Sequence, residues 1–261
     1  MTSFVTSGDG TRIAFSAAGD GPPVVLVGGG LDDGSENEPL AAVLARWFTV
    51  VNYARRGRGA SGDTAPYSVG REVEDLAALV AAVGGPVHLF GASSGGALAL
   101  IATAAGLPVE RVGVYEVPYL TDPAMRAAWL SYVDELTALL AAGSRDDAVA
   151  AFMRLAGAGD DEIAGARAAS VWPSLETLAP TLAYDAACLG DGEVPTMLFS
   201  AIDQPVLVAT GAAGPEPSFY DTAADALVAA LPGAERSVLS RPGHVADPAL
   251  LGPLLRRFFT S

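Results

Sequence analysis

Short apolar runs that alternate with helical patterns constrain the fold of this chain more than any other feature. The runs Val24–Val27, Phe48–Asn52 and Val87–Phe90 are rich in Val, Leu and Phe, a composition typical of parallel strands that are buried on both faces. Apolar residues at helical spacing follow at Arg71–Val83 and Gly95–Ala105. The order is strand, loop, strand, helix, strand, helix. The sequence therefore predicts an α/β fold with a mostly parallel, doubly wound sheet.

The two ends of the chain extend this pattern. Near the start, Gly8-Asp9-Gly10 separates two β-rich runs, Phe4–Thr6 and Arg12–Ala17. This spacing predicts a hairpin, because Asp-Gly tolerates the positive φ that tight turns need. Near the end, strand and helix patterns alternate again at Pro205–Thr210, Tyr220–Leu231, Arg236–Leu239 and Pro248–Phe259.

The middle of the chain has a different character. A fourth apolar run, Arg111–Val117, precedes residues 118–200, in which strand patterns vanish and helical spacing dominates. We therefore expect a single domain over residues 1–261, with a helical cap at residues 118–200 inserted after the fourth parallel strand. The helices of this cap are expected at Asp122–Ala142, Arg145–Gly157, Asp160–Ala169 and Leu175–Cys188.

Aromatic residues within the predicted cap have two interpretations. Trp129, Tyr132 and Trp172 are among those that lie in the helical segment. Packing onto the sheet is favoured over substrate contact for any single one of them, because aromatic side chains at helical spacing usually face a core. They are also the candidate substrate-binding residues.

The charge balance excludes several classes of function. The 261 residues include 30 acidic and 15 basic side chains, for a net charge of −15, and every basic residue is arginine. Without lysine, the chain has neither a catalytic Schiff-base lysine nor the lysine of a phosphate-binding loop. The negative charge, which no basic stripe interrupts, disfavours nucleic acid and anionic membranes as partners.

The sequence also predicts where the protein works. The lone Cys188 cannot form an internal disulfide, and the first ten residues lack the basic stretch and apolar run of a signal peptide. The sequence contains no long uncharged apolar stretch, so no membrane span is predicted. A cytoplasmic protein is therefore expected, and no pattern in the sequence indicates its oligomeric state.

A strand-turn-helix motif carries the chemistry. Gly91-Ala92-Ser93-Ser94-Gly95-Gly96 follows the Val87–Phe90 run and opens the next helix. G-x-S-x-G in this context is a nucleophile elbow, where small residues two before and two after the serine let the backbone turn sharply and expose the hydroxyl. A chance glycine-rich turn is the alternative in a chain with 30 glycines. We predict that Ser93 is the nucleophile.

Two backbone N–H groups are predicted to form an oxyanion hole. Ser94 supplies one at the N-terminus of the elbow helix, where partial positive charge favours an oxyanion. The other is expected from the loop after Val24–Val27, because its three glycines let the backbone approach a bound carbonyl closely. Gly30 is the first candidate and Gly29 the second. A phosphate loop is the alternative for a glycine triplet, but carboxylates follow this one instead of Gly-Lys.

The two histidines have different expected roles. His88 lies inside the buried Val87–Phe90 run and is expected to be structural. His244 lies in a loop between the last strand and the last helix, and loops at strand ends often carry chemistry. We predict that His244 is the general base, which takes the proton from Ser93 and returns it to the leaving group.

With these motifs the chain resembles the α/β-hydrolase superfamily, in particular its small serine-dependent esterases and haloperoxidase-like members, over nearly all 261 residues. The resemblance implies an α/β-hydrolase fold and a Ser-His-acid triad. Two aspartates of the family are replaced in this chain. Ala54 stands in place of one, and Gly214, after the Pro205–Thr210 run, stands in place of the triad acid. The matching segments are Gly28-Gly29-Gly30 in place of the usual His-Gly loop, Tyr53–Ser61 where the family has D-x-R-G-x-G-x-S, the elbow, and Gly243-His244.

Three explanations account for the missing acid. The first is Glu116 in the Arg111–Val117 run, a position that some relatives use, including certain haloalkane dehalogenases; we expect its strand two positions from the elbow strand. A carboxylate at a buried strand end needs a partner, which is either the histidine or an arginine or backbone amides. The second explanation is an acid from the group Glu216, Asp221 and Asp247. The third is no acid, which leaves a Ser-His dyad or a retired triad. We predict Glu116.

Together these residues predict a serine-dependent hydrolase, most simply a carboxylic-ester hydrolase, with no cofactor and no metal. Its partner would be a small or medium apolar ester, lactone, amide or thioester, because the cap is helical and apolar. The net charge disfavours a strongly anionic substrate, although Arg55, Arg56 and Arg58 could offset it. The alternatives are a lyase, cyclase or isomerase of natural-product metabolism, and a ligand-binding module with a vestigial site.

Overall fold

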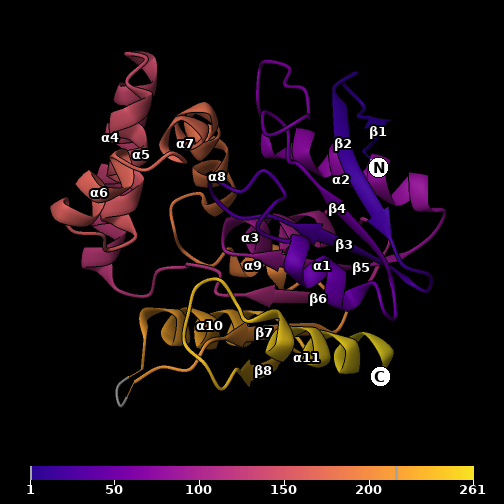
Figure 1. Cartoon of the computed structure of the whole chain (residues 1–261). Helices are drawn as coiled ribbons and strands as arrows, with labels where there is room; N and C mark the ends of the chain where they lie inside the picture. Colours follow the sequence, from indigo (N-terminus) through magenta and orange to yellow (C-terminus); the bar gives the residue numbers. More distant parts are fainter. Residues whose placement is uncertain (1, 215–216) are drawn as a thin grey trace.

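The computed structural model describes residues 2–214 and 217–261, and within this part the chain forms one eight-stranded sheet (Figure 1). The strand order is β1-β2-β4-β3-β5-β6-β7-β8. Strands β3 to β8 run parallel to one another, whereas β2 pairs antiparallel with β4 and β1 pairs antiparallel with β2 at the edge of the sheet. The strands are β1 Ser3–Thr6, β2 Arg12–Ala18, β3 Pro23–Val27, β4 Thr49–Tyr53, β5 Val87–Ala92, β6 Val109–Tyr115, β7 Val206–Thr210 and β8 Glu235–Val238.

Helices cover both faces of the sheet, as expected for a doubly wound fold. Helices α1 and α11 contact each other, and their apolar side chains share one buried cluster with β3, β4 and β7. Apolar side chains of α2, α3 and α10 belong to the larger cluster on the opposite face. The bounds are α1 Glu38–Leu44, α2 Val69–Val83, α3 Ser94–Ala104, α10 Phe219–Ala230 and α11 Pro248–Thr260.

A helical segment joins β6 to β7, after the fourth parallel strand, as the sequence predicts. Helix α8 of this segment packs on α3 and α2, while α4 and α5 pack on each other. Figure 1 shows α4, α5 and α6 grouped together, with α7 and α8 between this group and the sheet. The bounds are α4 Pro123–Ala141, α5 Arg145–Leu155, α6 Asp160–Arg167, α7 Trp172–Leu178, α8 Leu182–Leu189 and α9 Thr196–Phe199.

The structure confirms the N-terminal hairpin, in which Thr6 pairs with Arg12, and corrects three predictions about local structure. The expected loop before Phe48 contains helix α1, which begins with Pro39 in its first turn. The single helix expected at Leu175–Cys188 is divided, because a 3₁₀ turn at Ala179–Thr181, which contains Pro180, separates α7 from α8. The predicted strand Arg111–Val117 ends instead at Tyr115, and Glu116 leaves the sheet with a φ of 47°.

The strand order also corrects the expected position of Glu116. Strand β6 pairs directly with β5, so the strand that precedes Glu116 is the immediate neighbour of the strand that carries Ser93, and not two positions away. The ends of these two strands therefore lie next to each other.

Among the described residues, no helix is both long and apolar enough to cross a bilayer.

Glycines make the junction between β5 and α3 possible. A Cβ atom on Gly95 would collide with the carbonyl oxygen of Val27 and would lie 2.5 Å from that of Gly28. A Cβ on Gly91 would lie 2.6 Å from the carbonyl carbon of Gly95. Because these neighbours are backbone atoms, they cannot move aside as a flexible side chain could. Gly91 thus lets α3 pack closely on β5, and Gly95 lets α3 pack closely on the end of β3.

We expect the substitution Gly95→Ala to destabilise the fold, because the added methyl group overlaps two backbone carbonyls. Overpacking costs about 1–3 kcal/mol or more, which thermal denaturation followed by circular dichroism would measure. The control is Gly165→Ala in α6, where an added Cβ meets no atom within 4 Å. That variant should gain about 0.5–1 kcal/mol from helix propensity, and equal stability of the two variants would contradict the prediction.

Candidate active site

Ser93 occupies the strained turn between β5 and α3. Its φ of 53° and ψ of −130° lie outside the regions that a serine ordinarily adopts. The Ser93 N–H donates to the Tyr115 carbonyl at 2.9 Å, which ties the turn to the end of β6. Within the described residues, the non-glycine residues with positive φ are Leu31, Ser93 and Glu116, which follow β3, β5 and β6. Backbone strain of this kind is typical of functional sites.

The predicted oxyanion residues lie around Ser93. A Cβ on Gly29 would be 3.1 Å from the Ser93 Cβ and 3.8 Å from its Oγ, so the glycine loop abuts the nucleophile. A Cβ on Gly30 would be 3.2 Å from the Phe152 ring. Ser94 is the first residue of α3, so its N–H has no acceptor within the helix. The geometry brings these three residues together, and their role in binding an oxyanion stays a prediction.

Glu116 and His244 are in direct contact. The distance from His244 Nδ1 to Glu116 Oε2 is 2.9 Å, and the Gly211 N–H donates to Glu116 Oε1 at 2.9 Å. The Glu116 side chain is 6% exposed, whereas the His244 side chain is 44% exposed. Gly211 directly follows β7, so the Glu116 carboxylate lies beside the strand end from which the family's usual acid comes. A carboxylate on Nδ1 leaves the other ring nitrogen free for a nucleophile.

The contact between Ser93 and His244 is not made in this structure. Within residues 2–214 and 217–261, no hydrogen bond joins Ser93 Oγ to the His244 ring. Hydrogen bonds between nucleophile and base are often long without substrate and tighten when it binds.

The other carboxylates considered for the triad have different partners. Asp221 caps α10 through Ser218 and pairs with Arg236 at 2.7 Å. Asp247 caps α11 and pairs with Arg241 at 2.9 Å. Glu216 lies outside the described residues. Of the candidates that the structure describes, only Glu116 meets the His244 ring.

Two tyrosines that the sequence did not single out hold the His244 loop. Tyr115 Oη donates to the carbonyl of Gly243 at 2.6 Å. The Tyr220 ring stacks on the His244 ring, with their centroids 4.9 Å apart. The position of Tyr115 beside Glu116 at the end of a strand could have drawn attention to it. Its contact with Gly243 could not be predicted from the sequence, because the two residues are 128 positions apart.

His88 is a core residue, as predicted. It is 3% exposed, and its ring stacks on Phe259 with centroids 4.6 Å apart. Burial lowers the pKa of the His88 imidazole, which favours the neutral form of the ring within the core.

The arginines that were considered for binding an anionic substrate are buried and paired. Arg55, Arg56 and Arg58 are at most 1% exposed. Arg55 binds Glu72 and Asp185, and Arg58 also binds Asp185. Arg56 binds Asp75 and Asp9, outside this cluster. Because their charges are neutralised internally, these arginines do not offset the net negative charge for a substrate.

The predicted substrate-binding aromatics pack inside the helical segment. Trp129, Tyr132 and Trp172 are 5% to 7% exposed. The indole N–H of Trp129 donates to the Gly190 carbonyl at 3.0 Å, and that of Trp172 donates to Asp146 at 2.8 Å. These contacts agree with the packing interpretation, while substrate contact by these residues stays a prediction.

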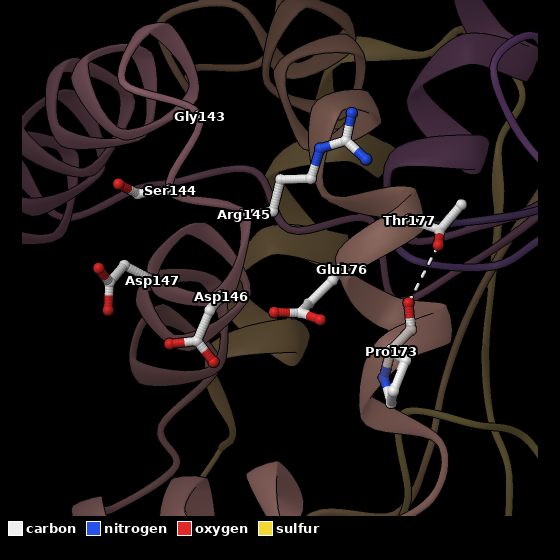
Figure 2. Close-up of a pocket in the computed structure, with 8 residues that line it drawn as sticks. All are labelled: Gly143, Ser144, Arg145, Asp146, Asp147, Pro173, Glu176 and Thr177. Atoms are coloured by element: carbon white, nitrogen blue, oxygen red, sulfur yellow. Dashed lines mark hydrogen bonds between the residues drawn. The ribbon is translucent and has the colours of Figure 1, made fainter.

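A cavity of about 430 Å³ opens on the surface between α5 and α7. Figure 2 shows its lining, which includes Asp146, Asp147 and Glu176 and none of the predicted site residues. Asp146 and Asp147 pair with Arg167. The cavity is therefore polar, is separate from the elbow, and has two of its carboxylates already neutralised.

This combination of fold and elbow defines a class of protein, and comparison with known proteins agrees. The chain belongs to the Alpha/beta hydrolase family, which matches residues 17–251. An alpha/beta hydrolase from Sphaerobacter thermophilus DSM 20745 is 44% identical, and its crystal structure superposes with a TM-score of 0.88 over 98% of this chain and 100% of that chain.

Three further proteins match this chain at lower identity. The uncharacterized hydrolase YraK of Bacillus subtilis (strain 168) is 36% identical over 95 residues, which span 35% of each protein. The enol-lactonase from Burkholderia xenovorans LB400 has a TM-score of 0.70 at 22% identity, over 99% of this chain and 100% of that chain. The esterase RhEst1 from Rhodococcus sp. ECU1013 has a TM-score of 0.69 at 22% identity, over 100% and 98%. At this identity the last two show the shared fold alone.

Proposed function

We propose that this member of the Alpha/beta hydrolase family is a serine-dependent carboxylic-ester hydrolase that acts on a small or medium apolar ester or lactone. The observation that carries the proposal is the 2.9 Å contact between Glu116 and His244, because it supplies the acid that Gly214 cannot. The strained backbone of Ser93 supports its role as nucleophile.

In this proposal, Ser93 Oγ attacks the acyl carbon while His244 takes its proton. Glu116 holds the ring in the tautomer that presents Nε2 to the serine and stabilises the imidazolium that forms. The N–H groups of Ser94 and of Gly30 or Gly29 bind the oxyanion of the tetrahedral intermediate. The bond to the alcohol then breaks as His244 returns the proton. Water, activated by the same ring, releases the carboxylic acid.

The surroundings of the oxyanion loop support an apolar acyl group. Phe152 on α5 lies beside Gly30, and the exposed Val245 follows His244. The nearby arginines are neutralised by carboxylates, which argues against an anionic substrate. An esterase and an enol-lactonase share the fold, which is consistent with acyl transfer.

The test is the release of p-nitrophenol from short-chain p-nitrophenyl esters. We expect a burst of one equivalent followed by steady turnover, and Ser93→Ala should abolish the burst because no acyl-enzyme can form. Ser131→Ala, at an exposed position of α4, is the control and should leave both phases unchanged. Absence of Ser93-dependent release of p-nitrophenol by the unsubstituted protein would contradict the proposal and favour a non-hydrolytic enzyme or a ligand-binding module.

A further inference from the structure

A buried carboxylate on the helical segment contacts the elbow. Ser94 Oγ donates to Asp185 Oδ1 at 2.7 Å, although the two residues are 91 positions apart. Asp185 lies on α8, is 5% exposed, and reaches the first turn of α3 because α8 packs on that helix. The residue that carries one proposed oxyanion donor is thus tied to the segment between β6 and β7.

Arg58 connects the same carboxylate to the glycine loop. Its Nη2 donates to both oxygens of Asp185 at 2.8 Å, and its Nη1 donates to the carbonyl of Gly29. In a planar trans peptide, a carbonyl and the N–H of the next residue point in opposite directions. The guanidinium that fixes the Gly29 carbonyl therefore also fixes the direction of the Gly30 N–H.

Arg55 makes the equivalent connection one peptide earlier. Its Nη1 donates to Asp185 Oδ1 at 2.6 Å and to the carbonyl of Gly28 at 3.2 Å, which orients the Gly29 N–H. Hydrogen bonds from a charged donor to a carbonyl also polarise the peptide and strengthen its N–H as a donor. Both candidate donors of the loop are thus held by guanidiniums that share one carboxylate.

The charges of this cluster suit the neighbourhood of an oxyanion. A Cβ on Gly30 would lie 3.5 Å from Asp185 Oδ2, so the carboxylate is close to the loop. Burial opposes ionisation of Asp185, but the charges of Arg58 and Arg55 outweigh it and hold the pKa of the carboxyl below its usual value. An unpaired carboxylate here would repel an oxyanion, whereas the two guanidiniums neutralise it.

We infer that Asp185 is a positioning residue, which aims both backbone donors of the oxyanion hole through Ser94, Arg58 and Arg55. This inference rests on the proposed ester hydrolysis. Donors stabilise a transition state most when they are already oriented, because no reorganisation is then needed during the reaction. Loss of this orientation should lower kcat and leave KM nearly unchanged, since the ground-state carbonyl depends less on it.

The experiment compares two changes within the cluster with one matched change outside it. Ser94→Ala keeps the backbone N–H and removes the contact to Asp185, and Asp185→Asn keeps the shape of the side chain and removes its charge. Asp75→Asn is the control, because Asp75 is also a buried carboxylate that pairs with an arginine, Arg56. Arg56 also contacts Asp9 and the Arg71 carbonyl, so this ion pair is separate from the Asp185 cluster. Each variant is assayed for kcat and KM on one p-nitrophenyl ester, for melting temperature, and for inhibition by an alkyl trifluoromethyl ketone. Ser93 adds to the carbon of this ketone, and the ketone oxygen becomes an oxyanion.

We expect kcat to fall about 10- to 100-fold in Ser94→Ala and Asp185→Asn, less than the loss of a whole donor, with KM within about 3-fold. Affinity for the ketone should fall in parallel, because it depends on the same donors. Ser94→Thr, which retains the hydroxyl, should recover most of the activity. Asp75→Asn should lower the melting temperature but leave kcat and ketone affinity within about 3-fold.

The inference is overturned if Ser94→Ala and Asp185→Asn behave like Asp75→Asn, or if they raise KM without lowering kcat. If Asp185→Asn does not fold, Ser94→Ala decides alone, since it removes a single oxygen atom. Failure of the proposed function gives a different result, namely no Ser93-dependent release of p-nitrophenol by the unsubstituted protein, and it removes this inference as well. An intact burst with unchanged kcat in Ser94→Ala removes the positioning role only.

Discussion

Glu116→Gln is expected to lower kcat for a p-nitrophenyl ester by about 10²- to 10⁴-fold. The neutral amide cannot stabilise the imidazolium of His244, and its NH₂ group can turn toward Nδ1 and favour the wrong tautomer. The fold should persist, because the side-chain oxygen of glutamine can still accept the Gly211 N–H. Steady-state kinetics with a parallel circular dichroism spectrum would measure both effects.

Asp221→Asn is the matched control for this prediction. Asp221 is a carboxylate near the end of β7 that caps α10 and binds Arg236, and it does not contact His244. Its replacement should lower the melting temperature, because it weakens the capping box with Ser218 and the ion pair with Arg236, while leaving kcat unchanged. Near-normal turnover in Glu116→Gln would remove Glu116 from the triad and direct attention to Glu216.

His244→Ala is expected to reduce ester hydrolysis by about 10⁴-fold or more, because a single imidazole carries every proton transfer of the proposed reaction. The chain has one other histidine and no lysine, and that histidine is enclosed by Phe48 and Phe259. No second imidazole is therefore available to replace His244. The measurement is the single-turnover rate of acylation, which separates proton transfer from product release.

His88→Gln provides the comparison. His88 lies near the start of β5, paired in register with Val24 and Arg111 of the neighbouring strands, whereas Ser93 follows the other end of the strand. This variant should lose stability through the lost stacking on Phe259 but retain most of its turnover while folded. Retained activity in His244→Ala together with loss in His88→Gln would reverse the assignment of the base.

Features that depend on consecutive residues were predicted from the sequence. The apolar runs that became β3, β4 and β5, the hairpin, and the G-x-S-x-G elbow are each encoded within a few positions. Periodicity and steric limits act over this range. The errors have local causes as well: Pro180 divides a predicted helix, and the short α1 offered too few residues for a helical period to emerge.

Which strands are neighbours in the sheet was harder to predict, because the strand order depends on how the whole sheet assembles. The pairing of β5 with β6 decided that Glu116 and Ser93 follow adjacent strands. The interpretation of Arg55, Arg56 and Arg58 also changed, because the partners of these arginines are distant from them in the sequence. Their sequence suggests exposed charge, but the carboxylates that neutralise them come from three separate regions of the chain, around Asp9, α2 and α8.

By itself, the sequence determined the fold class, and it predicted Ser93 as the nucleophile and His244 rather than His88 as the base, because each of these follows from local pattern and from the count of histidines. Only the tertiary structure decided which carboxylate meets the His244 ring and that Asp185 joins the elbow to the glycine loop. These contacts link residues 128 and 91 positions apart. A side chain finds such a partner only when strands and helices pack in three dimensions, and no spacing in the sequence records that distance.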